Sequence, residues 1–133
     1  MNLRPGTGSE ASPLSQVGPE PALLAPGFVV WVAPDPTIGV EQAGRRPAVI
    51  VSSREYLDTI TELALVIPVT TSARGWDNHV PLSGPTGLDG TSFAMTEQIR
   101  AISRRRIARV SGQVDAGTLK AIMAWLDDLL VKP

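Results

Sequence analysis

The sequence contains no cysteine, which excludes a disulfide framework, a thiolate metal site and a thiol nucleophile. It contains a single histidine, His79, so two imidazoles cannot share acid and base catalysis, and a multi-histidine metal site is excluded as well. The carboxylates are scattered along the sequence rather than clustered. We therefore expect no metal cofactor and no thiol chemistry.

Nucleotide motifs and long apolar runs are also missing. There is no GxGxxG and no GxxxxGK segment, and the glycines of "GPTGLDG", residues 84–90, precede a strand rather than a helix, so they indicate a turn. The apolar runs are strand-sized, and no stretch of signal-peptide length stands before Pro26. The sequence therefore predicts a cytoplasmic protein without a nucleotide cofactor or a membrane segment.

What the chain does contain is arginine, concentrated in its middle. The 133 residues carry a net charge of −1 and are 43% hydrophobic, enough for one domain with a core. Residues 45–109 nevertheless hold nine of the ten arginines against six acidic residues, a local balance of +3. The planar guanidinium of arginine suits bidentate contact with phosphate. Ordinary surface arginines explain the same count, so composition leaves both interpretations open.

The chain divides at about residue 26. Residues 1–26 include five prolines, three glycines and three serines without a periodic apolar pattern, so we expect a flexible extension there and a folded domain over 27–133. Within the domain, proline and glycine turns separate six short apolar segments, and a short helix with Ser53 as its N-cap is expected over 53–60. The six expected strands are 28–34, 46–52, 62–72, 78–82, 91–95 and 107–114. This pattern is typical of a small barrel or curled sheet.

An amphipathic helix is expected near the end of the sequence. Asp115 is placed as its N-cap, and an apolar stripe follows at helical spacing. The stripe consists of Leu119, Ile122, Met123, Leu126 and Leu130. Trp125 stands at the edge of this stripe, where a large ring either flanks the core, which we favour, or contacts another subunit.

The remaining chemistry rests on arginine, threonine and carboxylate at strand ends. Metal-free cleavage of RNA by the neighbouring 2′-hydroxyl needs a base, cationic donors for the charged phosphorane, and a proton for the leaving oxygen. Arg46 and a nearby hydroxyl can provide the donors, although a strand-end arginine and the β-propensity of Thr70 and Thr71 also have plain structural explanations. Ser72 and His79 could form a nucleophile and its base, but no nucleophile elbow surrounds Ser72.

Three segments together carry a family resemblance. "VVWVAPDPTIGVEQAGRRPAVIVSS", residues 29–53, resembles the first two strands and the connecting loop of the MazF/PemK family of toxin endoribonucleases. "VIPVTTS", residues 66–72, is similar to the family's third strand with its threonine, and "TEQIRAI", residues 96–102, to a later segment. The three occur in the family's order between residues 27 and 112, and the sequence is identified as a member on that basis.

The resemblance implies a mostly β (α+β) fold, an SH3-like barrel of curved antiparallel strands with short helices and a C-terminal amphipathic helix, working as a homodimer. It implies a metal-independent endoribonuclease that cuts single-stranded RNA, usually mRNA, at specific sequences. It also implies a cognate antitoxin that holds the enzyme inactive. No cofactor is implied.

The resemblance assigns four catalytic candidates. Arg46, just before the strand proline, matches the family's catalytic arginine, and we expect it to stabilise the phosphorane rather than to donate a proton, because a guanidinium keeps its protons in proteins. Thr70 matches the catalytic threonine, and Glu41 matches a loop glutamate implicated in some members. Glu97 stands where many members have an aspartate that serves in some as general base. The chain departs from the family at residues 26–28, where Pro-Gly-Phe replaces a charged pair.

A second group of residues is expected to contact RNA. It consists of Arg45, Gln42, Thr71, Ser72, Trp76, His79, Gln98 and Arg100. Trp76 either stacks on an unpaired base or covers the core, and His79 either meets RNA or is a solvated residue at a strand start. The cluster "RRRIAR", residues 104–109, is expected to form surface salt bridges, because strand alternation sends its arginines to different faces.

Two alternatives of other classes stay open. Gyrase-poisoning toxins of the CcdB type resemble this fold, but their activity is associated with a C-terminal Trp-Gly-Ile, whereas this sequence ends in Val131, Lys132 and Pro133. The other alternative is a non-catalytic homologue that only binds a protein partner, which residues 1–26 and Glu97 support.

Overall fold

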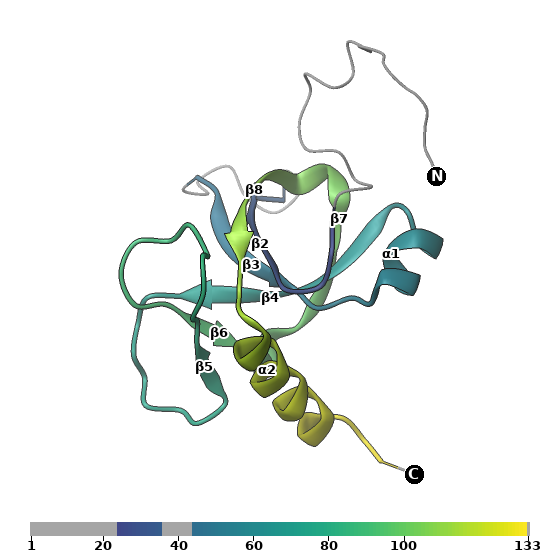
Figure 1. The fold of residues 1–133 in the computed structure, drawn as a ribbon. Coiled ribbons are helices and arrows are strands. Elements are labelled where there is room, and N and C mark those ends of the chain that lie inside the picture. The colour runs from purple at the N-terminus through teal and green to yellow at the C-terminus, as the bar shows by residue number, and fades with distance from the viewer. Residues whose placement is uncertain (1–23, 36–43, 133) are drawn as a thin grey trace.

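The computed structural model describes residues 24–35 and 44–132 of the chain. Its elements, labelled as in Figure 1, are β2 (Phe28–Val32), β3 (Arg46–Ile50), α1 (Arg54–Thr59), β4 (Leu63–Thr70), β5 (His79–Pro81), β6 (Phe93–Met95), the 3-10 helix η3 (Thr96–Gln98), β7 (Arg100–Ser103), the 3-10 helix η4 (Arg104–Arg106), β8 (Ile107–Gln113) and α2 (Ala116–Leu129). The six expected strands are therefore confirmed, with slightly shorter bounds. No helix in the described ranges is long and apolar enough to cross a membrane.

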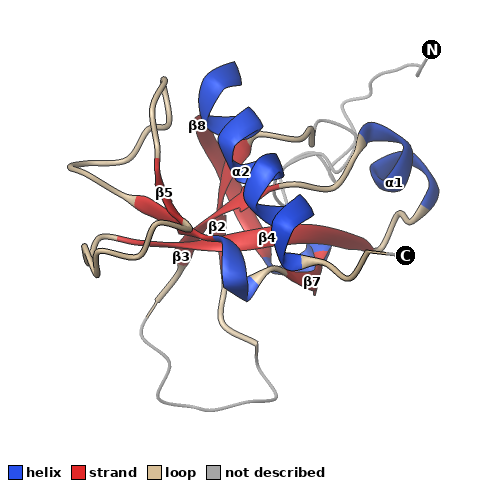
Figure 2. Cartoon of the chain, turned by 90° about the horizontal axis from the view of Figure 1, so that it is seen from below, coloured by secondary structure: helices blue, strands red, loops and turns tan. Residues whose placement is uncertain are grey.

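The strands form one antiparallel sheet. The described strands follow the order β5-β6-β4-β3-β2-β8, and β7 also pairs with β4. In Figures 1 and 2, α1 and β5 lie on opposite sides of the molecule. The expected mostly β fold of antiparallel strands with short helices and a C-terminal helix is confirmed, although the described strands form an open path rather than a closed ring.

β7 is the strand that the sequence pattern did not predict. Its four residues read Arg-Ala-Ile-Ser, and only Ile102 is buried, so it lacks the apolar signal that marked the other strands. Pairing with β4 holds it in place, with Val66 opposite Arg100. Farther along β4, Val69 pairs with Ala94 of β6. Because five residues separate Ala94 from Arg100 but only two separate Val66 from Val69, the excess chain bulges out as η3.

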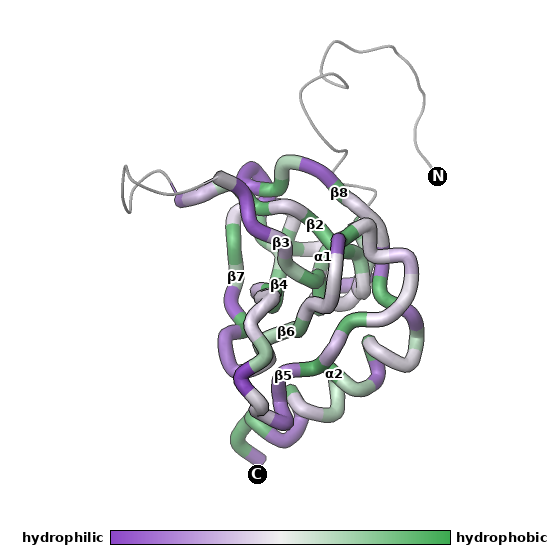
Figure 3. The backbone as a smooth tube through the Cα atoms, turned by 90° about the vertical axis from the view of Figure 1, so that its left-hand side faces the viewer, coloured by the Kyte–Doolittle hydropathy of each residue, from purple (hydrophilic) through white to green (hydrophobic). Residues whose placement is uncertain are grey.

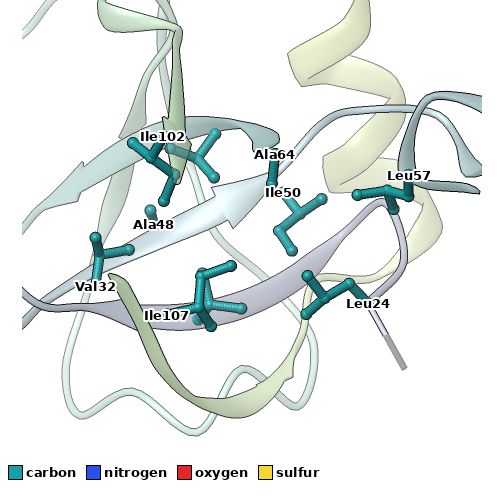
Figure 4. Close-up of a cluster of buried hydrophobic side chains, with 10 residues drawn as sticks. Leu24, Val32, Ala48, Ile50, Leu57, Ala64, Ile102 and Ile107 are labelled. Carbon is teal, nitrogen blue, oxygen red and sulfur yellow. The ribbon is translucent and has the colours of Figure 1, made fainter. Parts of the chain in front are cut away.

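The sheet is apolar on both faces, and each face belongs to a different core cluster. Alternation along β2, β3 and β4 sends one set of side chains to each side. The first core cluster contains Val30, Ile50 and Val66, together with Leu57 of α1, and Figure 4 shows part of it. The second core cluster contains Val29, Val49 and Ile67 and is covered by α2 (Figure 2). Burial on both faces explains why these strands read as continuous apolar runs.

Helix α2 begins as expected but buries a narrower stripe. Its N-cap is confirmed, because Oδ1 of Asp115 accepts a hydrogen bond of 2.8 Å from the backbone N–H of Thr118. Ile122 and Leu126 are buried in the second core cluster, and Trp125 is half-buried against it, which confirms its position as a core flank. The expectation was wrong for two members of the stripe, because Met123 and Leu130 are 47% and 63% exposed. Figure 3 shows the alternation of hydrophobic and hydrophilic residues along the helix.

The packed chain begins earlier than composition suggested. Leu24 and Ala25 are 5% and 4% exposed, and Leu24 belongs to the first core cluster. The next residues form a tight turn, in which the backbone N–H of Phe28 bonds to the carbonyl of Ala25 and Gly27 has a φ of 91°. Proline before glycine favours such a turn. Pro26 and Gly27 therefore form a turn within the packed part of the chain, which includes Leu24.

Candidate functional site

A groove of about 610 Å³ opens where β3 begins and β4 ends. The apolar residues that line it include Val32, Ala48, Val66 and Ile102 of the first core cluster. The charged residues that line it are Arg46, Arg74, Arg100, Arg106 and Asp35. We call it the arginine groove. Four guanidinium groups and one carboxylate suit a ligand that is anionic.

Two adjacent strands bring Arg46 and Thr70 to the same groove. Ala48 of β3 pairs with Pro68 of β4, and extending this antiparallel register by two residues places Arg46 opposite Thr70 on the same face. Both residues line the groove. In β3 the chain passes from exposed Arg46 through Pro47 to a buried segment, so the core fixes the backbone while the guanidinium stays at the rim.

The Thr70 side chain is oriented by the turn that follows β4. Its hydroxyl oxygen accepts a hydrogen bond of 3.1 Å from the backbone N–H of Ser72. A hydroxyl that accepts one bond keeps its own hydrogen available for donation. Thr70 is therefore a half-buried donor at the groove, directly across from an arginine.

The bulge at η3 brings two more of the expected residues to the groove. Gln98 ends η3 and Arg100 begins β7, and both line the groove. The amide nitrogen Nε2 of Gln98 lies 3.6 Å from Sδ of Met95 and 3.4 Å from Oε2 of Glu97. The groove thus collects Arg46, Thr70, Gln98 and Arg100 from segments that are distant in the sequence.

Glu97 is not among the residues that line the groove. Its two carboxylate oxygens lie 3.0 and 3.1 Å from Nε2 of His79, and Nδ2 of Asn78 donates to Oε1 at 2.7 Å. Partial burial opposes ionisation, but hydrogen bonds from His79, the backbone, Gln98 and Asn78 outweigh it and lower the pKa of Glu97 below its ordinary value. Glu97 is therefore a carboxylate held in its ionised form by neighbours.

His79 lies inside the fold rather than at a solvated strand start. It is 5% exposed, and its buried Nδ1 has no hydrogen-bond partner within the described ranges. Trp76, which is 51% exposed, packs on it with the ring centroids 4.8 Å apart. The guanidinium carbon of Arg74 lies 5.9 Å from the centroid of the Trp76 ring. Trp76 therefore covers His79 with one part of its ring and leaves the rest open to solvent.

The remaining expected residues either do not line the groove or lie outside the residues that the structure describes. Arg45, Thr71 and Ser72 are exposed and do not line the groove, although Arg45 and Thr71 each adjoin a residue that does. Glu41 and Gln42 lie outside the described residues. Within the described ranges, no group of three or more histidine, aspartate or glutamate side chains could hold a metal ion.

The arginines of residues 104–109 divide among separate tasks. Arg104 donates to the backbone carbonyls of Leu57, Ile60 and Leu63, which joins η4 to α1 and β4. Arg106 lines the groove, and the guanidinium carbon of Arg109 lies 5.1 Å from the Trp31 ring centroid. Sequence reasoning missed Arg106, and also Arg74. Their only sequence signal was their position in a basic segment, which does not distinguish groove arginines from others.

Comparison with known proteins places the chain in a family. Residues 25–130 match the model of the PemK-like, MazF-like toxins of type II toxin–antitoxin systems. The chain belongs to this family. This toxin is 39% identical over 105 residues to the endoribonuclease toxin MazF of Escherichia coli, covering 78% of this chain and 91% of that protein. It is also 39% identical over 114 residues to the endoribonuclease MazF9 of Mycobacterium tuberculosis, covering 81% of this chain and 93% of that protein.

A solved structure supports the same assignment. In a crystal structure of MazE-MazF from Deinococcus radiodurans, the similar chain is 30% identical to this toxin, with a TM-score of 0.69. The match covers 80% of this chain and 95% of that chain. The resemblance seen in the three sequence segments is thereby confirmed.

Proposed function

We propose that the arginine groove is the active site of this toxin and that Arg46 and Thr70 are its catalytic residues. The toxin is an endoribonuclease of a type II toxin–antitoxin system, and its proposed substrate is single-stranded mRNA. One observation carries the proposal: two separate sequence motifs, on adjacent strands, each supply one residue to the same groove.

The proposed reaction is an internal transfer at phosphorus. The 2′-hydroxyl of one nucleotide loses its proton and attacks the adjacent phosphorus, and the bond to the 5′-oxygen of the next nucleotide breaks as that oxygen gains a proton. The products are a 2′,3′-cyclic phosphate and a 5′-hydroxyl. The guanidinium of Arg46 binds the non-bridging oxygens and stabilises the charge that builds up on them. The hydroxyl of Thr70 donates a hydrogen bond to the same phosphate, and no metal ion takes part.

The general base, which takes the proton from the attacking 2′-hydroxyl, has to be assigned to a carboxylate other than Glu97. Glu97 is a poor candidate because its oxygens already bind His79 and Asn78 and it does not line the groove. We assign it a positioning role, in which it holds η3 and therefore Gln98 and Arg100 at the groove. The sequence motif leaves Glu41 as the candidate base.

The groove also suggests how RNA is held. An unpaired base can lie against the partly buried prolines that line the groove while phosphates meet Arg46 and Arg100. The amide of Gln98 can hydrogen-bond to a base edge. Beyond the groove, the exposed part of Trp76 offers a surface for stacking, with His79 as its support from within.

The residues beside the groove complete the proposed RNA path. Arg45 precedes Arg46, and Thr71 and Ser72 follow Thr70, so each can contact the strand as it enters or leaves. Gln42 stays a candidate contact from the sequence motif alone. We propose these residues as binding rather than catalytic residues, and Arg45, Thr71 and Ser72 do not line the groove.

The proposed setting follows from the family. The Deinococcus radiodurans structure is a MazE-MazF complex, which supports a cognate antitoxin as the partner of this toxin. We propose that the toxin acts as a homodimer in the cytoplasm, where its mRNA substrate lies. We also propose that the residues before Leu24 are dispensable. Limited proteolysis that removes them while RNA cleavage persists supports this, and loss of cleavage on their removal contradicts it.

The experiment is cleavage of a long RNA of mixed sequence in excess EDTA, with the cut ends mapped and chemically identified. We expect discrete cuts ending in 2′,3′-cyclic phosphate, which disappear in Arg46→Ala and Thr70→Ala. Arg54→Ala is the matched control, because Arg54 is an exposed arginine at the start of α1, away from the groove. A folded wild-type protein that cuts no RNA contradicts the proposal. Both relatives named above are endoribonucleases, so gyrase poisoning and purely protein-binding activity are not favoured.

A further inference from the structure

We propose that Arg106 is a fixed anchor in the arginine groove for an RNA phosphate other than the one that is cleaved. This inference rests on the proposed function and adds to it a binding residue that neither the sequence motifs nor the family resemblance assigned. The observations that support it are the contacts of Arg106 with Ala33, its place in the groove, and its separation from Arg46.

Arg106 is tied to the chain at the end of β2 by two reciprocal hydrogen bonds. The backbone N–H of Ala33 donates to the carbonyl of Arg106 at 2.7 Å, and Nε of Arg106 donates to the carbonyl of Ala33 at 3.0 Å. The first bond fixes the backbone of η4 beside β2, and the second fixes the plane of the guanidinium. An arginine held in this way loses little conformational entropy when it binds an anion.

The rest of the guanidinium remains available to a ligand. Within the described ranges, its two terminal nitrogens make no hydrogen bond or ion pair, and Arg106 is half-buried while it lines the groove. Those nitrogens carry four N–H donors. Partly buried cationic donors without partners are best satisfied by a charged acceptor, and phosphate accepts two parallel hydrogen bonds from one guanidinium.

The strand order separates this anchor from the catalytic arginine. Val32 of β2 pairs with Arg46 of β3 on one side and with Ile107 of β8 on the other, and Arg106 directly precedes Ile107. Arg46 begins β3, and Arg106 ends η4 just before β8, so their backbones lie on opposite sides of β2, about 10 Å apart across the sheet. The Nε bond to Ala33 holds the Arg106 guanidinium on the β8 side of β2, so we place a second phosphate there rather than the one at Arg46. Arg106 therefore binds a different phosphate, and its contact is the same before and during the chemical step.

Neighbouring arginines provide an internal control. Arg104 is occupied by the carbonyls of Leu57, Ile60 and Leu63, so its removal would disturb the fold. Arg105 is exposed and does not line the groove. Arg105→Ala therefore removes the same charge one residue away without removing a groove contact.

The test compares wild type, Arg106→Ala and Arg105→Ala for binding and cleavage of the RNA mapped in the cleavage experiment. Binding is followed by fluorescence anisotropy over a range of salt concentrations, using that RNA with a 2′-deoxy nucleotide at the cut so that it cannot be cleaved. We expect Arg106→Ala to bind about 10-fold more weakly. We also expect the slope of log Kd against log salt to fall by about 0.7 in magnitude, as for one lost phosphate contact. The single-turnover rate at saturating RNA stays at the wild-type value.

Three results overturn the anchor. One is an Arg106→Ala variant that binds like Arg105→Ala, and another is an unchanged Kd with a lower saturating rate. If Arg106→Ala does not fold, Arg106→Lys carries the test, because it keeps the charge but loses the Nε bond to Ala33. Wild-type affinity in Arg106→Lys is the third contradictory result. A wild-type protein that neither binds nor cuts RNA refutes the proposed function itself. If wild type cleaves RNA, Arg46→Ala does not, and Arg106→Ala binds and cleaves RNA like wild type, the anchor alone is refuted.

Discussion

The side chains of Glu97 and His79 are hydrogen-bonded to each other outside the lining of the arginine groove. Both oxygens of the Glu97 carboxylate lie within 3.1 Å of Nε2 of His79, and neither residue lines the groove. The two residues come from η3 and β5, so their contact joins the segment before β7 to the segment after the 72–78 loop. Glu97, which the family resemblance suggests as a general base, thus has both carboxylate oxygens engaged by His79.

Glu97→Gln tests the positioning role. We expect kcat to fall by less than about 10-fold, because the amide keeps the size of the side chain and one acceptor oxygen for the positioning contacts, whereas loss of a general base typically costs about 10²–10⁴-fold. Asp77→Asn is the control, since Asp77 is an exposed acid in the same loop region. A loss of more than about 100-fold in Glu97→Gln alone, with binding unchanged, assigns Glu97 to the chemistry instead.

The Glu97 carboxylate should also make stability depend on pH. Its pKa is lowered in the folded protein, so the folded state releases this proton more readily than the unfolded state does. The carboxylate therefore contributes stability above its ordinary pKa of 4.5, and this contribution is lost as the pH falls through the lower folded value. In urea unfolding from pH 7 to pH 3, the stability difference between wild type and Glu97→Gln should shrink on acidification. A difference that is constant over this range contradicts the assignment.

Leu24→Ala tests where the packed domain begins. Leu24 is 5% exposed in the first core cluster, and removing its side chain should lower the free energy of unfolding by about 2–4 kcal/mol. Leu130→Ala is the matched control, because Leu130 is 63% exposed and its truncation should change the stability by less than about 0.5 kcal/mol. Equal effects in urea titrations would show that Leu24 does not belong to the core.

Two glycines give opposite expectations for the same substitution. A Cβ at Gly112 of β8 would overlap the backbone of Pro85 and Thr86, so Gly112→Ala should destabilise the fold by about 1–3 kcal/mol. A Cβ at Gly117, in the first turn of α2, would meet only Oδ1 of Asp115 at 3.7 Å, an ordinary contact. Gly117→Ala should therefore stabilise by about 0.5–1 kcal/mol. Thermal unfolding of both variants measures the two changes in stability. A Gly112→Ala variant as stable as wild type would contradict the expected overlap, because the loop at Pro85 would then have moved aside at little cost.

The sequence predicted those features that depend on local pattern. Continuous apolar runs marked β2, β3 and β4, and the two motifs pointed to Arg46 and Thr70, which stand at strand ends and line the groove, because a strand's boundary and its end residues are encoded within a few positions. It did not predict β7, since Arg100 and exposed Ala101 give no apolar signal and the strand exists only through its pairing with β4.

The other misses share a cause, which is long-range register. Nothing near Glu97 in the sequence indicates that His79 will reach it, and the bond depends on how β5, β6 and η3 are placed. Arg106 looks like Arg105 until η4 is set beside the end of β2. Leu24 reaches the core because the turn at Pro26 and Gly27 sets it beside the strands, which the sequence around it does not indicate. Amino-acid composition shows that such residues are present, but it does not show which residues they contact.

The most direct test of the central claim is the single-turnover cleavage rate of Arg46→Ala at saturating RNA, measured in EDTA beside wild type and Arg54→Ala. If Arg46 stabilises the phosphorane, its loss should slow cleavage by about 10²–10³-fold, as for removal of a donor to a developing oxyanion, while Arg54→Ala keeps the wild-type rate. The RNA affinity of Arg46→Ala should change far less than its rate. A wild-type saturating rate in a folded Arg46→Ala variant would contradict the assignment of the arginine groove as the active site.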